Sequence, residues 1–320
     1  MKKNKIKDTG LEVTELSFGT SSLGSMPDTY GYEVSEDRAQ KTLNRFFQGP
    51  VNMLDTSRNY AMGESEKRIG KAIKENGGWP NGFLLSTKLD RNMDTLVLDK
   101  NRVRESLEES LKTLNVDSVD ILFLHDPEYA KDINDITKKG GAMDELFKIK
   151  NEGLAKAAGV AMGKVDIMFP LLKDWDFDVI INHNRYTLLN REANEMYDYA
   201  SSKNIAIFNA APYAGGVLAK GPDNFKKITY QDATEEKLAP AREFEKVCKK
   251  HNVELGAAAL QFSLRDNRIT STICGVTSVE SIEKNLAWAN TNIPEEFWNE
   301  VLKLPYSTKD PESERNFTPG

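Results

Sequence analysis

The sequence predicts an α/β protein, a single (β/α)8 TIM barrel with an N-terminal β-hairpin. Short apolar segments alternate with amphipathic helical segments along almost the whole chain, which indicates a parallel sheet with crossover helices. Eight apolar segments have strand length, and eight strands joined by right-handed crossovers close naturally into a barrel. Because 320 residues suit one barrel and no linker divides them, we expect a single domain over residues 1–320.

The first expected element is a hairpin over residues 5–14 that turns at Thr9-Gly10. The barrel strands follow it as short apolar runs, each bounded by polar or glycine-containing segments. We expect these strands at residues 15–20, 51–54, 83–87, 119–125, 154–160, 177–183, 204–210 and 268–275.

The helices are expected between the strands, where apolar residues recur at helical spacing. The first begins near Ser35, a favourable N-cap that Glu36 and Asp37 follow. Helices are expected near residues 35–47, 64–75, 102–114, 142–151, 164–173 and 191–202. The loop 211–233 is long enough to predict a functional lid, and the polar segment from about 305 to 320 is expected to be extended or disordered.

Composition excludes several classes of partner. The net charge of −6 and the lack of a basic patch disfavour nucleic acid and anionic membranes. No segment reaches the ~20 apolar residues that cross a bilayer, and no apolar stretch of a signal peptide follows the lysine-rich start. Cys248 and Cys274 lack the spacing of a zinc site or a disulfide framework. We therefore expect a cytoplasmic protein, monomer or homodimer, that binds a small molecule and no metal, nucleic acid or membrane.

Ionisable side chains end three successive predicted strands. Asp55 ends the second strand, Lys88 the third and His125 the fourth, and Tyr60 lies in the turn after Asp55. The carboxyl ends of barrel strands meet at one mouth, so these groups are expected to lie together. A lysine held by a carboxylate favours the phenolate of a nearby tyrosine, and we expect Lys88 to make Tyr60 acidic enough to exchange protons.

These residues resemble the aldo-keto reductase family. The resemblance is carried by LEVTELSFGTSSLGS, LDTSRNYAMGESEKRIGKAI, STKLD, DILFLHDPE, INHNRYTLLN, APYAGGVLAKG and ICGVTSVESIEKN. It implies that Tyr60 is the general acid/base, that Lys88 tunes it and that Asp55 anchors Lys88. It also implies that His125 orients the substrate oxygen, while a nicotinamide carries the hydride.

The cofactor is expected to be NAD or NADP, although the chain has no GxGxxG motif for a Rossmann-type site. The resemblance implies a dinucleotide across the barrel mouth. Its expected contacts are Gly19, Thr20, Asp55, Asn182, His183, Ala211, Pro212, Gly215, Gly216, Leu218, Gly275, Thr277, Ser278, Ser281 and Asn285.

Four departures from the family pattern affect the cofactor. Gly275 and Ser281 stand where many members have the Lys and Arg that hold a 2′-phosphate, and Glu280 and Glu283 are nearby, so NAD is slightly favoured. Ala161-Met162 replaces a Ser-Asn pair. His183 replaces a Gln and Ala210 an aromatic residue at the nicotinamide.

HDPE, GVAM, NRYTLLN and AAPYAGGVLAKGP resemble the aldose 1-dehydrogenase branch, which includes enzymes for L-fucose, L-galactose and D-threo-aldoses. That resemblance implies oxidation of a sugar hemiacetal C1–OH to a lactone. Pyridoxal 4-dehydrogenase and a general aldehyde reductase are alternatives within enzymes. A further alternative is a nucleotide-binding regulatory subunit with negligible turnover, similar to potassium-channel β subunits.

Overall fold

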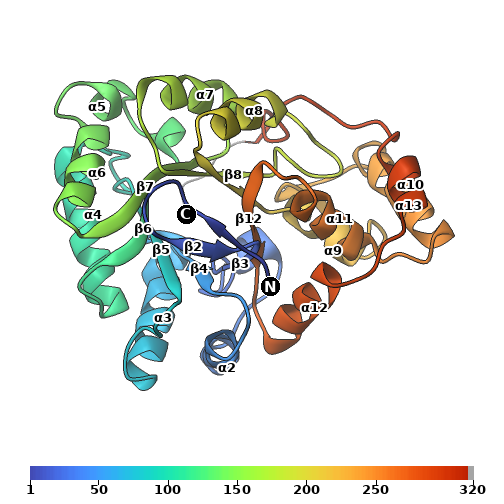
Figure 1. The fold of residues 1–320 in the computed structure, drawn as a ribbon, viewed down its shortest axis with the longest axis horizontal. Coiled ribbons are helices and arrows are strands. Elements are labelled where there is room, and N and C mark those ends of the chain that lie inside the picture. Colours follow the sequence, from blue (N-terminus) through green and yellow to red (C-terminus); the bar gives the residue numbers. More distant parts are fainter. Residues whose placement is uncertain (316–320) are drawn as a thin grey trace.

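The predicted barrel is confirmed by a computed structural model, which describes residues 1–315. Eight parallel strands close in the order β12-β3-β4-β5-β6-β7-β8-β9, and the helices lie around them (Figure 1). The strands are β3 (Leu16–Gly19), β4 (Met53–Asp55), β5 (Leu84–Leu89), β6 (Val119–His125), β7 (Ala155–Met162), β8 (Val179–His183), β9 (Ala206–Ala210) and β12 (Ile269–Gly275).

The N-terminal hairpin is also confirmed. Strands β1 (Lys3–Lys5) and β2 (Glu12–Thr14) pair antiparallel, and the hairpin crosses one end of the barrel (Figure 1). Its apolar residues Ile6, Leu11 and Val13 belong to the cluster that fills the barrel interior. Burial of these side chains closes the end of the barrel opposite the strand carboxyl termini.

The helices form an outer layer around the strands (Figure 1). They are α1 (Pro27–Tyr30), α2 (Glu36–Phe47), α3 (Glu64–Glu75), α4 (Lys100–Leu114), α5 (Asn134–Thr137), α6 (Ala142–Asn151), α7 (Val165–Asp174), α8 (Asn194–Ser202), α9 (Val217–Lys220), α10 (Glu235–Lys250), α11 (Leu255–Leu264), α12 (Val279–Ala289) and α13 (Glu295–Val301). Ser35 caps α2 as expected, because its side chain accepts a hydrogen bond from the Arg38 backbone. Helix α11 was not expected, since its residues are almost all buried and leave no amphipathic period.

The long loop after β9 contains short regular elements. It holds α9 and two strands, β10 (Lys227–Ile228) and β11 (Gln231–Asp232), which pair with each other. No helix among residues 1–315 is long and apolar enough to cross a membrane.

The C-terminal segment 306–315 has little regular structure, as expected, but it contacts the barrel. Ser307 forms a β-bridge with Asn190, and Asp310 and Glu312 bind the fully buried Arg185. Residues 316–320, which belong to the same expected tail, lie outside the described residues. The segment therefore packs beside the mouth of the barrel.

Candidate active site

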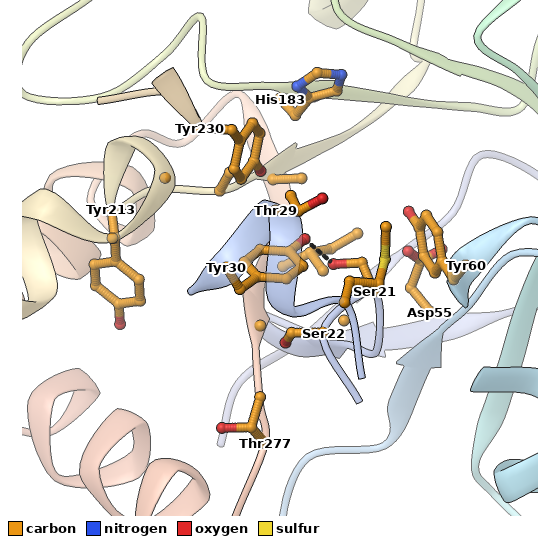
Figure 2. Close-up of a pocket in the computed structure, with 18 of the residues that line it drawn as sticks. Ser21, Ser22, Thr29, Tyr30, Asp55, Tyr60, His183, Tyr213, Tyr230 and Thr277 are labelled. Carbon is orange, nitrogen blue, oxygen red and sulfur yellow. Dashed lines mark hydrogen bonds between the residues drawn. The ribbon is translucent and has the colours of Figure 1, made fainter. Parts of the chain in front are cut away.

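A cavity of about 920 Å³ opens at the carboxyl ends of the barrel strands. It is lined by loops after β3, β4, β5, β6, β8, β9 and β12 and by Arg315 of the C-terminal segment. In barrels of this architecture, this face carries the active site. Figure 2 shows Tyr60 and Asp55 together at one side of the cavity, and Tyr213 and Thr277 at the other.

Asp55 and Lys88 form a buried ion pair in the cavity wall. Lys88 Nζ donates to Asp55 Oδ2 at 2.7 Å and to the Thr56 carbonyl at 2.6 Å. The pair forms because β4 and β5 are in register at Asp55 and Ser86, and Lys88, two residues farther along, points to the same side of the sheet. Ser86 Oγ donates to Asp55 Oδ1 at 2.9 Å, which holds the carboxylate in place.

Tyr60 lies in a tight turn between β4 and α3. Lys88 Nζ is 4.6 Å from the centre of the Tyr60 ring. The two residues after Tyr60, Ala61 and Met62, have left-handed backbone angles with φ of 52° and 54°, a conformation that costs energy in non-glycine residues. The loop after β3 packs against this turn, and a Cβ on Gly24 would lie 2.6 Å from the Ala61 Cβ. Glycine is therefore required at position 24 to hold the turn that carries Tyr60.

The Tyr60 hydroxyl is not acidified in this structure, which differs from the expectation. Burial, and next the charge of Asp55, raise the pKa of Tyr60 well above 10. The Asp55 carboxylate pairs with the ammonium of Lys88 and opposes its effect on the phenol. Tyr60 is therefore a protonated hydrogen-bond donor facing the cavity.

His125 completes the predicted group of four. The centres of the His125 and Tyr60 rings are 5.7 Å apart, and the rings meet edge to face. His125 Nδ1 lies 2.6 Å from Asp90 Oδ1, and its Nε2 lies 3.7 Å from Asp126 Oδ1. Neither acid was expected at the site from the sequence, although each directly follows the end of a strand.

Ten of the predicted cofactor contacts line the cavity, and five do not. Those that line it are Gly19, Asp55, His183, Ala211, Gly215, Gly216, Gly275, Thr277, Ser281 and Asn285. Those that do not are Thr20, Asn182, Pro212, Leu218 and Ser278.

The alternation of side chains along a strand explains one of these differences. Asn182 points away from the cavity, and its amide donates to the Met162 and Gly163 carbonyls. The next residue, His183, points into it, because successive side chains of a strand face opposite sides. Burial lowers the pKa of His183 below 6.5.

Three more of these five residues make contacts within the protein instead of lining the cavity. Thr20 Oγ1 donates to the Asp55 carbonyl, and Leu218 is fully buried in the core. Ser278 is the N-cap of α12, where it forms a reciprocal capping box with Ser281. The Ser281 hydroxyl therefore already accepts from the Thr277 and Ser278 backbone amides.

Basic side chains that were not expected to contact the cofactor line the cavity or lie next to a residue that lines it. Lys220 and Lys284 line it, and Arg38 Nη2 lies 3.5 Å from Thr277 Oγ1. Lys220 lies over the ring of Phe225 and Lys284 over that of Trp288. Burial lowers the pKa of Lys220. These cations, together with the α12 N-terminus, suit the phosphates of a dinucleotide.

Aromatic residues from distant loops were also missed. Tyr30 of α1 donates to or accepts from Ser21 at 2.6 Å, and its ring meets that of Tyr230 edge to face, as Figure 2 shows. Tyr213 bonds the Asn285 side chain across the cofactor side of the cavity. None of these tyrosines was named as a contact, although Tyr213 lies in the segment APYAGGVLAKG that carries the family resemblance.

Comparison with known proteins agrees with the geometry. The model of the aldo/keto reductase family matches residues 15–304. The chain is 31% identical to L-galactose dehydrogenase of Arabidopsis thaliana over 284 residues, covering 88% of this chain and 85% of that protein. It is 27% identical to D-threo-aldose 1-dehydrogenase of a Pseudomonas species, covering 92% and 94%. It is also 26% identical to pyridoxal 4-dehydrogenase of Microbacterium luteolum, covering 92% and 95%.

A solved structure has the same fold over nearly all of the chain. The holo form of aldo-keto reductase AKR11C1 from Bacillus halodurans superposes with a TM-score of 0.79 at 21% identity, covering 98% of this chain and 99% of that one. The family match spans nearly all of the barrel and includes every residue of the Asp55, Tyr60, Lys88 and His125 group. This chain therefore belongs to the aldo/keto reductase family of oxidoreductases.

Proposed function

We propose that the protein oxidises the C1–OH of a sugar hemiacetal to a lactone with NAD or NADP. The observation that carries this proposal is the group of Asp55, Lys88, Tyr60 and His125 on one wall of a large cavity. Such a group can take up the proton that an alcohol loses when it gives up a hydride. The similarity to the aldose dehydrogenases supports the choice of substrate class.

In the proposed site, Tyr60 donates to or accepts from the substrate oxygen, and Lys88 and Asp55 hold it in position. The buried Asp55–Lys88 pair keeps an ammonium 4.6 Å from the phenol ring. This charge would stabilise negative charge that develops on the oxygen of Tyr60 or of the substrate. His125 would contact the same oxygen from the other side.

The residues around the cavity fit a nicotinamide dinucleotide. Lys220 and Lys284 would face its phosphates, and Gly275 leaves open space because a Cβ there would meet only Ser22 Oγ at 4.0 Å. His183 would lie near the nicotinamide carboxamide. When bound, the nicotinamide supplies hydride chemistry that no side chain can.

Asp126 supports a substrate rich in hydroxyl groups. It lines the cavity beside His125, and its buried Oδ1 accepts no hydrogen bond from residues 1–315. His125 Nε2 lies 3.7 Å from this oxygen, too far for a hydrogen bond, and a buried acceptor without a hydrogen bond is costly. A sugar hydroxyl next to the reacting carbon would satisfy it, whereas an apolar aldehyde would leave it without a donor. This favours a sugar over the substrate of a general aldehyde reductase.

The test is a substrate panel with purified protein. L-Fucose, L-galactose, D-arabinose and pyridoxal are each incubated with NAD and with NADP, and absorbance of the reduced nicotinamide is followed. Turnover of one of the sugars is the expected result, and the Tyr60→Phe variant gives the background rate. Turnover of pyridoxal alone would favour the pyridoxal 4-dehydrogenase alternative, which the similarity to such an enzyme also supports. Cofactor binding without turnover of any sugar, aldehyde or pyridoxal would favour the regulatory alternative.

A further inference from the structure

Asp90 lies directly behind His125 at the end of β5. It is fully buried, and its Oδ1 is 2.6 Å from His125 Nδ1. Its Oδ2 accepts hydrogen bonds from Ser57 Oγ at 2.6 Å and from the Asn59 backbone amide at 3.1 Å. Both carboxylate oxygens therefore have donors, and the carboxylate is held rigidly between the turn after β4 and the end of β6.

These contacts fix the position of the proton on His125. Burial disfavours the charge of Asp90, but His125 and Ser57 outweigh burial and hold the pKa of Asp90 below 3.8. An ionised carboxylate cannot donate, so the hydrogen between Asp90 and His125 must be on Nδ1. In a neutral imidazole with hydrogen on Nδ1, Nε2 carries a lone pair and is an acceptor.

We infer that Asp90 is a positioning residue that makes His125 a second proton-exchange group beside Tyr60. By holding Nδ1–H, Asp90 leaves Nε2, on the cavity side of the ring, as a proton acceptor when the ring is neutral. When the ring is charged, Nε2–H is a donor to the same substrate oxygen. This inference rests on the proposed function, because it concerns the proton that the oxidation releases.

The surroundings of His125 favour the uptake of a proton. Asp90 faces Nδ1, Asp126 lies near Nε2 and Tyr60 lies beside the ring, and Lys88 and His183 line the same cavity. Burial of the ring opposes its charge, but Asp126 and Asp90 outweigh burial and raise the pKa of His125 above 6.5. Tyr60, with its pKa well above 10, stays protonated at neutral pH. In its neutral form, His125 is therefore the available proton acceptor.

With His125 as acceptor, both the hydride and the proton that the proposed oxidation releases have an acceptor. The C–H bond at C1 would break, and a bound oxidised nicotinamide would supply the acceptor for its electron pair as hydride. The O–H bond breaks as well, and its proton passes to His125 Nε2, directly or through the Tyr60 hydroxyl. The carbon–oxygen double bond of the lactone forms, and the new imidazolium is paired with Asp90. In the reductive direction, the charged ring returns the proton.

Nitrogen-15 NMR of histidine-labelled protein without cofactor tests the inference directly. The chain has three histidines, so the His125→Gln variant identifies the signals of His125. We expect the neutral ring to carry its hydrogen on Nδ1 and to titrate above 6.5. Asp90→Asn, whose amide can donate to Nδ1, should lower that pKa and populate the Nε2–H form. A wild-type ring with hydrogen on Nε2 would overturn the inference.

Ser106→Ala is the matched control. Ser106 Oγ accepts from the Asp90 backbone amide at 2.9 Å, so this variant disturbs the same residue and leaves its carboxylate untouched. Both the tautomer and the pKa of His125 should stay as in the wild type. A shift as large as that of Asp90→Asn would mean that packing around position 90, not its charge, controls the ring.

The pH dependence of turnover provides the second test. Oxidation needs neutral His125, so kcat should rise with pH through the His125 pKa, and Asp90→Asn should move this limb to lower pH. The same variant should lower kcat at neutral pH by about tenfold or more, with KM little changed. A uniform loss without a shifted limb would indicate a merely structural role. If the substrate panel fails, the proposed function fails, but the NMR result still decides the role of Asp90.

Discussion

The Tyr60 phenol is surrounded by groups with opposing effects on its proton. Lys88 Nζ lies 4.6 Å from its ring, yet burial and Asp55 raise the pKa of Tyr60 well above 10. The structure without cofactor therefore suits proton donation by Tyr60, the step that reduction requires. Oxidation requires an acceptor, and this difference is why the environment of His125 matters.

Removing the Tyr60 hydroxyl should cost turnover without affecting cofactor binding. Tyr60→Phe keeps the ring against Lys88 and His125 but removes the proton donor, so kcat should fall by ~10²-fold or more. Steady-state kinetics measures the loss, and quenching of protein fluorescence measures cofactor affinity. Tyr199→Phe is the control, since Tyr199 of α8 packs on Phe169 outside the cavity. Near-normal rates for Tyr60→Phe would remove it from the mechanism.

Cofactor preference also depends on single residues. Ser281 is occupied by the α12 cap, and no arginine or lysine stands at positions 275 and 281, so we expect NADH to bind at least as tightly as NADPH. Lys284 is the residue that could reverse this result, because it lines the cavity on α12. Titration of the wild type and of Lys284→Ala with both cofactors is the measurement. Far tighter NADPH binding that Lys284→Ala abolishes would contradict the expectation.

Among the elements, the C-terminal segment 306–315 is attached to the barrel by a buried ion cluster. Arg185 is fully buried and binds Glu312 Oε2 at 2.6 Å and Asp310 Oδ1 at 2.5 Å. Asn184, next to Arg185, contacts both the His183 ring and Glu312. The segment therefore supports one wall of the cavity and contributes Arg315 to its lining.

Breaking this cluster should destabilise the protein strongly. Glu312→Gln leaves the buried guanidinium with less compensating charge, and removing one partner of a buried ion pair typically costs about 3–5 kcal/mol. Urea unfolding measures the change in free energy. Glu314→Gln on the same segment is the control, because Glu314 pairs with Lys237 on the surface and exposed pairs contribute only about 0–1 kcal/mol. Equal effects of the two variants would show that the buried pair contributes little.

Helix α3 contains a buried acid that should make stability depend on pH. Glu66 is fully buried, accepts a hydrogen bond from Thr87 Oγ1 at 2.6 Å, and burial raises its pKa to about 7. The folded state thus keeps a proton that the unfolded state releases near pH 4.3. This contribution is complete below about pH 4 and is lost as pH rises through about 7.

Glu66→Gln should remove this pH dependence. The amide has nearly the same shape and no charge, so the variant should gain on the order of 3–4 kcal/mol relative to the wild type between pH 4 and pH 8. Unfolding by urea at both pH values is the measurement. A constant difference between the two proteins would mean that Glu66 keeps an ordinary pKa when buried.

At the scale of the whole molecule, the cavity is assembled from loops that are far apart in the chain. Residues after β3, β9 and β12 face one another across it, and a dinucleotide would bridge them. A ligand that binds only the folded state at 100 times its Kd adds about 2.7 kcal/mol of stability. NADH should therefore raise Tm in a concentration-dependent way, also in Tyr60→Phe. An unchanged Tm would contradict cofactor binding, whereas a raised Tm without turnover would favour the regulatory alternative.

The sequence predicted the site best where a residue's position along a strand decides whether its side chain reaches the mouth of the barrel. Asp55, Lys88 and His125 end successive strands, and the parallel register brings strand ends together wherever the chain forms a barrel. The same reasoning could have found Asp90 and Asp126, which also follow strand ends. Of the neighbours Asn182 and His183, which were both expected to contact the cofactor, only His183 faces the cavity. A shift of one residue in a strand reverses the side that a side chain faces.

By itself, the sequence determined the fold class and the four ionisable groups, because alternating strands and helices and strand-end positions are local properties of the chain. Only the tertiary structure decided the partners of those groups. The Asp90–His125 contact, the basic side chains around the cofactor end and the Arg185–Glu312 pair join segments that are 35 to 239 positions apart. Such contacts depend on how loops of irregular length pack, and their geometry sets burial and charge, and hence which group carries a proton.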